Sequence, residues 1–365
     1  MNDSTNSAVA SGTSAWPGVI RKYARFLPVT DATPIVTLNE GNTPLVRADN
    51  FVESIGGKFE LHLKYEGLNP TCSFKDRGMT MALSKAKERG AKVVICASTG
   101  NTSASAAAYA ARGGLKCVVI LPHGKIALGK LAQALVYGAK TIAIEGNFDD
   151  ALRIVRELGE ADDFEVVNSI NPVRIEGQKT ASFEICDQLG RAPDFHFLPV
   201  GNAGNITAYW KGFKEYYSVN LADCLPRIMG WQAAGSAPIV DGAPVDKPHT
   251  IATAIRIGNP ASWKQAVTAA SESKGLIRKV TDEEIIAAYK RIAATEGIFI
   301  EPASAASLAG IIKSSEAGEI PEGSVVTATM TGHGLKDPDL AIKEAGYEPT
   351  VVTPTKDAVM DAIGS

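Results

Sequence analysis

Lys75 is the first residue along the chain whose type and position suggest covalent chemistry. It stands in "NPTCSFKDRG", directly after the alternating segment "GKFELHLKYEGLN", which predicts a half-buried strand. Ser73 can cap a helix that runs to about Arg89, so Lys75 falls in its first turn, where the helix dipole disfavours an ammonium group. A lysine must lose its proton near neutral pH to act as a nucleophile or base, and Arg77 nearby favours that loss. The stretch alone leaves open a solvated lysine in a polar turn.

Two loops rich in glycine and asparagine follow predicted strands and precede predicted helices. They are "ASTGNTSAS" (97–105) and "LPVGNAGNI" (198–206). In a parallel α/β sheet such turns lie at the carboxyl ends of the strands, where ligands bind. The second loop could turn successive backbone N–H groups toward an anion, with phosphate as the natural ligand, through Gly201, Asn202, Ala203, Gly204 and Asn205. A tight turn without a ligand remains the alternative for this loop by itself.

A third segment of the same kind is "ATMTGHGLKD" (328–337), which follows an apolar strand. Thr331 offers a hydroxyl group at the carboxyl end of that strand. The alternative is a strand-ending turn whose threonine is satisfied by the backbone.

The elements that must position these residues alternate between short β-rich runs and helical patterns from residue 91 onward. This rhythm predicts βαβ units, because parallel strands need a crossover and the runs are apolar on both faces. We expect an α/β protein of two three-layer domains with mostly parallel sheets. The expected parts are a mobile tail at 1–15, a large domain at 16–85 plus 166–365, and a small α/β domain at 86–165. Residues 236–262, rich in Pro, Gly and Asp, predict a long loop.

Composition narrows the class of partner. The chain has 365 residues, 45% of them hydrophobic, and a formal net charge of −3 without a strongly basic segment, so we expect no nucleic acid and no membrane partner. Five scattered cysteines without a CxxC pair fit a reducing, cytoplasmic location. No signal peptide or spanning segment is evident. The histidines lack metal-ligand spacing, so we expect no metal site.

Taken together and in this order, "SFKDRG", "STGNTS", "GNAGN" and "TGHGLKD" resemble the threonine synthases, from "EGNTPL" (40–45) onward over nearly the whole chain. That family belongs to the pyridoxal-phosphate enzymes with the fold of the tryptophan-synthase β-subunit (fold type II). The resemblance implies the cofactor pyridoxal 5'-phosphate. Each motif alone is less specific, since "SxKDRG" also resembles the cysteine synthases and "SFK" the serine and threonine dehydratases.

The resemblance also implies roles for single residues. Lys75 would hold the cofactor as a Schiff base and act as the catalytic lysine, and Asn101 would bind the phenolic oxygen of the ring. The loop Gly201–Asn205 would bind the cofactor phosphate. Thr331 would bind the pyridine nitrogen, where a hydroxyl group donates to a neutral nitrogen without adding a formal charge.

The implied reaction converts O-phospho-L-homoserine and water into L-threonine and inorganic phosphate. Such a substrate needs a second anion site, and "VVNSINPVRIEGQ" supplies Asn168, Ser169 and Arg174 in the family's substrate-phosphate segment. An arginine suits this role because its planar fork pairs with two phosphate oxygens. The remaining donors for the substrate carboxylate or phosphate would be Ser98, Thr99 and Thr102.

Two other functions remain open at this point. A pyridoxal-phosphate dehydratase acting on threonine or serine expels hydroxide and has no use for a phosphate clamp at Arg174. A non-catalytic protein that senses a phosphorylated metabolite would not need Lys75. The resemblance also implies a homodimer, and the short polar segment ahead of the catalytic body predicts no N-terminal regulatory domain.

Overall fold

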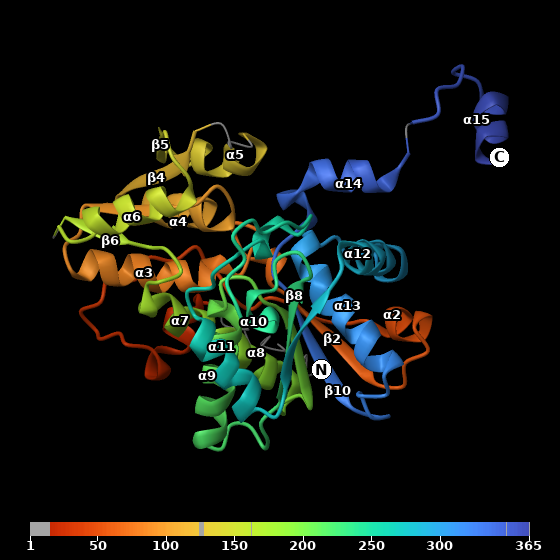
Figure 1. Ribbon diagram of the computed structural model, residues 1–365, viewed down its shortest axis with the longest axis horizontal. Coiled ribbons are helices and arrows are strands. Elements are labelled where there is room, and N and C mark those ends of the chain that lie inside the picture. Colours follow the sequence, from red (N-terminus) through yellow and green to blue (C-terminus); the bar gives the residue numbers. More distant parts are fainter. Residues whose placement is uncertain (1–14, 124–127, 162, 348, 365) are drawn as a thin grey trace, which may run out of the picture.

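The computed structural model describes residues 15–123, 128–161, 163–347 and 349–364 (Figure 1). The tail expected at 1–15 therefore lies almost wholly outside the described residues. Two sheets organise the chain, and helices cover both faces of each. This confirms the expected α/β class with mostly parallel sheets.

The larger sheet has six strands, and all of its neighbours are parallel except the first pair. Its β2 was predicted as half-buried, yet Lys64 and the following Glu66 are fully buried. A strand inside a covered sheet has no solvated face, so these charged groups must find partners within the protein. In order across the sheet the strands are β1 (Leu45–Arg47), β2 (Glu60–Tyr65), β10 (Val325–Met330), β7 (Phe195–Pro199), β8 (Arg227–Ala233) and β9 (Leu276–Val280).

Helices form a layer on each side of this sheet. One face packs against α2 (Asp49–Ser54), α12 (Asp282–Glu296) and α13 (Pro302–Glu316). The opposite face packs against α8 (Thr180–Leu189), α9 (Gly204–Ser218) and α11 (Trp263–Glu272). The short β-rich segments of the sequence therefore form buried strands, because helices cover the apolar residues on both of their faces.

The smaller sheet has four parallel strands, in the order β5 (Lys140–Ile144), β4 (Lys116–Pro122), β3 (Val93–Ala97) and β6 (Phe164–Val166). One face packs against α3 (Lys75–Glu88), α4 (Asn101–Gly113) and α5 (Leu128–Val136), and the other against α6 (Phe148–Leu158). The apolar face of α3, with Met79, Leu83 and Ala86, therefore belongs to the core of the smaller sheet.

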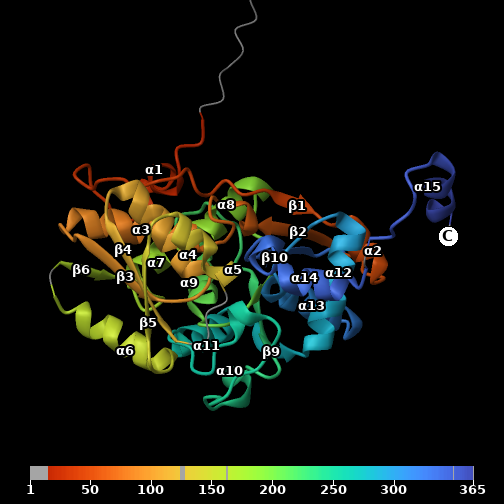
Figure 2. The same ribbon diagram turned by 90° about the horizontal axis from the view of Figure 1, so that it is seen from above.

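Short elements join these layers. The remaining helices are α1 (Val19–Lys22), α7 (Pro172–Gln178), α10 (Pro238–Asp241), α14 (Pro338–Ala345) and α15 (Lys356–Ile363), with 3-10 turns η1 (Ala24–Phe26), η2 (Glu66–Leu68), η3 (Thr253–Ile255) and η4 (Gly334–Lys336). The long segment expected at 236–262 contains only α10 and η3. At the C-terminal end, α15 stands apart from the rest of the molecule (Figures 1 and 2). The preceding α14 still contacts it, since the Glu344 carboxylate lies 3.0 Å from the Lys290 Nζ on α12.

No helix among the described residues is both long and apolar enough to cross a membrane.

Candidate active site

The predicted site segments all follow the carboxyl ends of parallel strands. Lys75 comes after β2, Thr331 after β10 and the loop 201–205 after β7, and these three strands are neighbours in the larger sheet. Asn101 follows β3, and Arg174 lies on α7 after β6, its neighbour in the smaller sheet. Adjacent parallel strands bring their carboxyl ends to one edge, which is why segments far apart in sequence can form one site.

Lys75 is the first residue of α3 and is half-buried. Its backbone N–H reaches the Ser73 Oγ at 3.4 Å, and its Nζ lies 4.1 Å from the centre of the Phe74 ring. The helix is one residue shorter at its start than the Ser73 cap predicts, because Phe74 takes the N-cap position. Burial and, to a smaller extent, the nearby Arg174 lower the pKa of Lys75 to about 7, against the opposing effect of Glu301. The lysine is thus poised to exchange a proton at neutral pH.

Arg77 does not tune Lys75 in the way that the sequence suggests. Its guanidinium is fully buried and donates to both oxygens of Glu66 and both of Glu184, at 2.6 to 2.7 Å. Lys64 joins the same cluster at 2.8 Å from Glu184. Two buried carboxylates balance these two cations, so Arg77 supports the fold beneath the site, and the cation acting on Lys75 is Arg174.

Arg174 is a buried cation with unmet hydrogen-bonding capacity. The side chain is 1% exposed, and its Nη1 donates to the Val167 carbonyl at 3.0 Å. Its Nε and Nη2 have no partner among the described residues. Burial lowers the pKa of Arg174 to about 10. A buried guanidinium that lacks an acid is costly unless an anion occupies the free donors, so these two nitrogens suit an anionic ligand.

The loop 201–205 leads directly into α9. Ala203 takes a left-handed conformation, with φ of 64°, and the helix begins at Gly204. The Asn205 Nδ2 is buried without a partner among the described residues. Unmet donors at the start of a 15-residue helix fit a phosphate group.

Asn202 and the segment "NSINP" meet at this loop. The Asn202 Nδ2 donates to the Ser169 Oγ, and its Oδ1 accepts from the Ala261 N–H at 2.7 Å. Asn168, 6% exposed, is instead paired with the backbone of Ala97, donating at 2.9 Å and accepting at 3.0 Å. Ser169 therefore lies beside the anion loop, whereas the amide of Asn168 ties the ends of β3 and β6 together.

Glu301 is a site residue that the sequence reasoning missed. Its buried carboxylate accepts from the Asn101 Nδ2 at 2.9 Å and from the Thr331 Oγ1 at 2.7 Å. Glu301 therefore connects Asn101, which follows a strand of the smaller sheet, with Thr331, which follows a strand of the larger sheet. Both residues were predicted to contact the cofactor ring. The available signal was "EPASAA", an acid placed just before a proline-led helix of small residues.

The loop between β3 and α4, together with the first turn of α4, carries the other predicted polar residues. Ser98, Thr99 and Thr102 are half-buried beside Asn101, and the Ser98 Oγ accepts from the Gly100 N–H at 3.2 Å. Their place at a helix start suits a carboxylate or phosphate.

Lys336 also lies near this site without having been predicted. Its Nζ donates to Gln133 on α5, so it links the "TGHGLKD" segment with the smaller domain. Burial lowers the pKa of Lys336, and the nearby Cys72 and Glu301 oppose that shift. His333 stacks on Tyr65, and burial lowers its pKa too. Both residues belong to the wall of the site.

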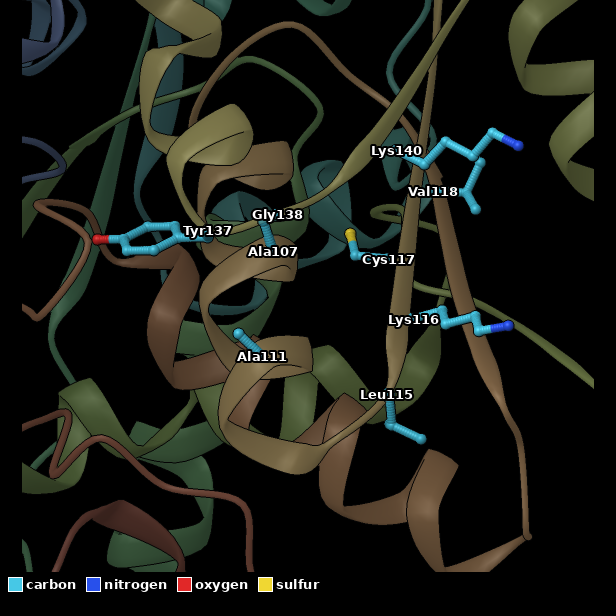
Figure 3. Close-up of a pocket in the computed structure, with 9 residues that line it drawn as sticks. All are labelled: Ala107, Ala111, Leu115, Lys116, Cys117, Val118, Tyr137, Gly138 and Lys140. Atoms are coloured by element: carbon cyan, nitrogen blue, oxygen red, sulfur yellow. The ribbon is translucent and has the colours of Figure 1, made fainter.

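A separate cavity of about 270 Å³ opens on the smaller domain (Figure 3). Its lining comes from α4, from β4 and from the turn that leads into β5, and includes Cys117, Tyr137 and Lys140. None of the predicted site residues lines it.

The residues at the strand ends fit pyridoxal phosphate. They offer an amine whose pKa is about 7, unmet buried donors near a helix start, and hydrogen-bonding groups at Asn101 and Thr331. The amine can react with the cofactor aldehyde, and the unmet donors can bind its phosphate. The groups at Asn101 and Thr331 can bind its polar ring.

Comparison with known proteins agrees with this fit. A family described as "Pyridoxal-phosphate dependent enzyme" matches residues 36–332. The threonine synthase of Synechocystis sp. is 59% identical over 338 residues, covering 93% of this chain and 88% of the relative. The threonine synthase of Halalkalibacterium halodurans is 57% identical, and the match covers 96% of this chain and 98% of the relative. The threonine synthase of Methanocaldococcus jannaschii is 55% identical, and the match covers 90% of this chain and 83% of the relative.

Solved structures share the fold at lower identity. Threonine deaminase isoform 2 from Solanum lycopersicum superposes with a TM-score of 0.73 at 22% identity, covering 90% of each chain. An O-ureido-L-serine synthase superposes with a TM-score of 0.71 at 19% identity, and the match covers 92% of this chain and 100% of that synthase. At such identities the likeness shows the fold alone.

Proposed function

This chain belongs to the pyridoxal-phosphate dependent enzymes and, within them, to the threonine synthases, and on that premise we propose that its site converts O-phospho-L-homoserine and water to L-threonine and phosphate. The observation that carries the proposal is Arg174, buried with two unpaired nitrogens beside Lys75. A substrate with a phosphate leaving group supplies the anion that this guanidinium lacks.

The cofactor would be held by the residues at the strand ends. Lys75 would bind it covalently, Asn101 its phenolic oxygen, Thr331 its ring nitrogen and the loop Gly201–Asn205 its phosphate. The free Nδ2 of Asn205 and the helix start behind it support the phosphate position. Bound there, pyridoxal phosphate supplies an electron sink for negative charge on the carbons next to the substrate amine.

Lys75 would move the protons of the reaction. When its Nζ is released by the incoming substrate amine, it can accept the proton from the substrate α-carbon, because its pKa of about 7 leaves much of it neutral at physiological pH. The same nitrogen can return a proton later in the cycle. Arg174 nearby keeps it from holding a proton too tightly.

The substrate anions would be divided between two groups of residues. Arg174, with Ser169 and Asn168, would take the phosphate, and Ser98, Thr99 and Thr102 the carboxylate. The hydrogen bond from the Asn202 Nδ2 to the Ser169 Oγ supports adjacent positions for the substrate phosphate and the cofactor phosphate. Two adjacent anions need strong donors, which favours a guanidinium over a lysine at this point.

The alternative is a pyridoxal-phosphate dehydratase acting on threonine or serine. Its leaving group is hydroxide, so the buried charge of Arg174 would have no ligand. Phosphate release from O-phosphohomoserine, measured beside 2-oxobutanoate formation from threonine, separates the two functions. Formation of 2-oxobutanoate as the main product would overturn the proposal.

Replacement of the guanidinium tests the proposal directly. We expect Arg174→Lys to raise the KM for O-phosphohomoserine about 10- to 100-fold, because charged hydrogen bonds are worth roughly 1.5 to 3 kcal/mol. Arg153→Gln, which removes an exposed ion pair with Glu157, serves as the control and should leave KM unchanged. An unaltered KM in Arg174→Lys, with cofactor bound, would contradict the role of this residue.

Three further points belong to the same proposal. We take the enzyme to be a cytoplasmic homodimer. Its scattered free cysteines support the cytoplasmic location, and the exposed apolar side chains of the C-terminal arm, the segment beyond Gly346, support the homodimer. We also retain the expected domain division at 86–165, which is supported by the four strands of the smaller sheet at 93–166, although β6 ends one residue beyond that bound.

A further inference from the structure

Asp76, the residue after Lys75, is a buried acid that the proposed reaction does not use. Its side chain is fully buried in the first turn of α3. Three donors reach its carboxylate, namely the Thr71 N–H at 2.6 Å, the Thr71 Oγ1 at 2.5 Å and the Ser105 Oγ at 2.6 Å. All three donors are neutral groups, so they fix the position of the carboxylate without forming an ion pair.

The number of donors requires an ionised carboxylate at this position. The Asp76 Oδ1 accepts from both hydroxyl groups, and its Oδ2 accepts from the backbone. A carboxylate accepts through both oxygens, whereas an asparagine would turn its NH₂ group toward one of these donors. Burial raises the pKa of Asp76 to about 6, and the hydrogen bonds from Ser105 and Thr71 oppose that rise. At neutral pH the group is therefore mostly ionised and can accept all three hydrogen bonds.

The two hydrogen bonds from Thr71 close the turn that carries Lys75. Within this turn Cys72 takes a left-handed conformation, with φ of 64°. A residue other than glycine keeps such a conformation only where its surroundings hold it. Asp76 accepts from Thr71 on the other side of Cys72 and thereby holds the backbone from which the reactive amine projects.

The third hydrogen bond joins this turn to α4. Ser105 is fully buried and lies one helical turn beyond Asn101, the first residue of α4. Asp76 is the second residue of α3, so the bond holds the starts of two neighbouring helices together (Figures 1 and 2). Lys75 and Asn101 open these two helices, and both are proposed to bind the cofactor.

A second side-chain hydrogen bond joins the same helices far from the site. The Lys87 Nζ, near the end of α3, donates at 3.0 Å to the carbonyl of Gly113, the last residue of α4. Between these two ends the helices pack through apolar residues, among them Met79, Leu83 and Tyr109. Apolar contacts are non-directional, so the hydrogen bonds at the ends define how far one helix lies along the other.

We propose that Asp76 is a positioning residue that, through Ser105, holds the start of α4 at a fixed place beside Lys75. The proposal rests on the cofactor and substrate placement of the proposed function. Residues at that helix start would bind the ring oxygen and the substrate carboxylate, whereas Lys75 would move the α-proton. A misplacement of about 1 Å between such groups can slow a reaction by about 100-fold, so the bond between the helix starts bears on the rate.

The substrate phosphate would be bound from a different helix. Arg174 lies on α7, and its Nη1 donates to the Val167 carbonyl. Loss of the bond between Asp76 and Ser105 should therefore disturb the carboxylate end of the bound substrate and spare its phosphate end. Inorganic phosphate, a product of the proposed reaction, is a probe for the phosphate end alone.

The test is Ser105→Ala, which removes the bond to α4 and leaves Thr71 paired with Asp76. In the cofactor-free protein we expect deuterium to enter the backbone amides of residues 104–108 about 10-fold faster, measured by mass spectrometry. In the holoenzyme we expect kcat/KM for O-phosphohomoserine to fall about 10-fold, while the inhibition constant of inorganic phosphate changes by less than about twofold. Lys87→Gln, at the far end of the same helix pair, is the matched control and should keep the wild-type values.

Asp76→Asn should show a loss at least as large, since it also opens the turn that carries Lys75. An unchanged exchange rate or an unchanged kcat/KM in Ser105→Ala would overturn the inference. So would an equal weakening of phosphate inhibition, or an equal loss in Lys87→Gln, because either result means a general loosening of the helix pair.

Ser105→Ala decides these points even when Asp76→Asn does not fold. Failure of the proposed function gives a different result, namely no phosphate release from O-phosphohomoserine by the wild-type enzyme. The exchange rates of the cofactor-free protein do not depend on that activity, so the two failures are told apart.

Discussion

At the scale of single residues, most buried charges of the chain are paired, and the exceptions lie at the site. Arg77 and Lys64 are neutralised by Glu66 and Glu184 at short distances. Arg174, by contrast, is buried without an acid, and burial depresses the pKa of Lys75. Unmet buried groups destabilise the folded chain, and they gather where ligands must later supply the missing partners.

Lys75→Ala is expected to abolish covalent attachment of the cofactor and to reduce phosphate release by about 10²- to 10⁴-fold, the usual contribution of a positioned acid or base. Cofactor content by absorbance and phosphate release by colorimetry check this. Lys85→Ala, which removes an ion pair with Glu88 on the same helix, is the control and should retain both. Undiminished turnover in Lys75→Ala would refute the catalytic role of this lysine.

The rate at which cofactor-free protein captures pyridoxal phosphate should depend on pH through Lys75. Only the neutral amine attacks an aldehyde, and burial has lowered its pKa from an ordinary 10.5 to about 7. We expect the rate to rise about tenfold per pH unit below 7 and to level off above it. Continued rise to pH 10, measured by stopped-flow absorbance, would mean that the amine has an ordinary pKa.

At the scale of elements, the crossing of α3 and α7 fixes Lys75 relative to Arg174. Gly177 on α7 packs so closely on α3 that a Cβ there would overlap the Arg77 carbonyl oxygen. Gly78 on α3 faces α7 in the same way, with a Cβ only 3.0 Å from the Arg174 carbonyl oxygen. Two glycines thus let the helix that bears the lysine approach the helix that bears the arginine.

Gly177→Ala is therefore expected to destabilise the protein by about 1 to 3 kcal/mol, the usual range for overpacking, and to weaken substrate binding by moving Arg174. Denaturant unfolding and the KM for O-phosphohomoserine measure the two effects. Gly364→Ala is the control, since a Cβ there would meet nothing closer than 3.6 Å. Equal stability of the two variants would show that α3 and α7 can separate without cost.

At the scale of the whole molecule, two α/β units meet at the site and an arm leaves the body. The units are linked near the site by Asn101 with Glu301 and by Lys336 with Gln133. The arm beyond Gly346 has no buried described residue, and Val351 and Ile363 are 93% and 72% exposed. Exposed apolar groups of this kind fit a contact outside the chain.

Ending the chain after Gly346 should leave the catalytic body intact. Because the removed side chains contribute nothing to the core, we expect the midpoint of thermal unfolding to change by no more than about 2 °C and cofactor content to stay the same. Sedimentation of both chains measures the homodimer, which we expect to be weakened by the truncation. A large fall in thermal stability at unchanged mass would show that the arm packs on its own chain.

The order of strands and helices and the turns at strand ends could be predicted from the sequence, because periodicity and turn residues act locally. The roles of Lys75 and Arg174 came from the resemblance to a family and stay predictions. The sequence could not reveal that Lys64 and Glu66 are buried, since that depends on which elements cover β2. It assigned to Arg77 an influence on Lys75 that belongs to Arg174, a residue about 100 positions away.

Glu301 shows most clearly the difference between what the local sequence determines and what the tertiary structure decides. Its motif names an acid before a helix, but only the meeting of α13, α4 and the end of β10 places its carboxylate between Asn101 and Thr331. Local sequence therefore determined the elements and put Lys75 at the start of a helix. Tertiary structure decided which charges face one another, because electrostatic and hydrogen-bonding partners are set by distance in space and not along the chain.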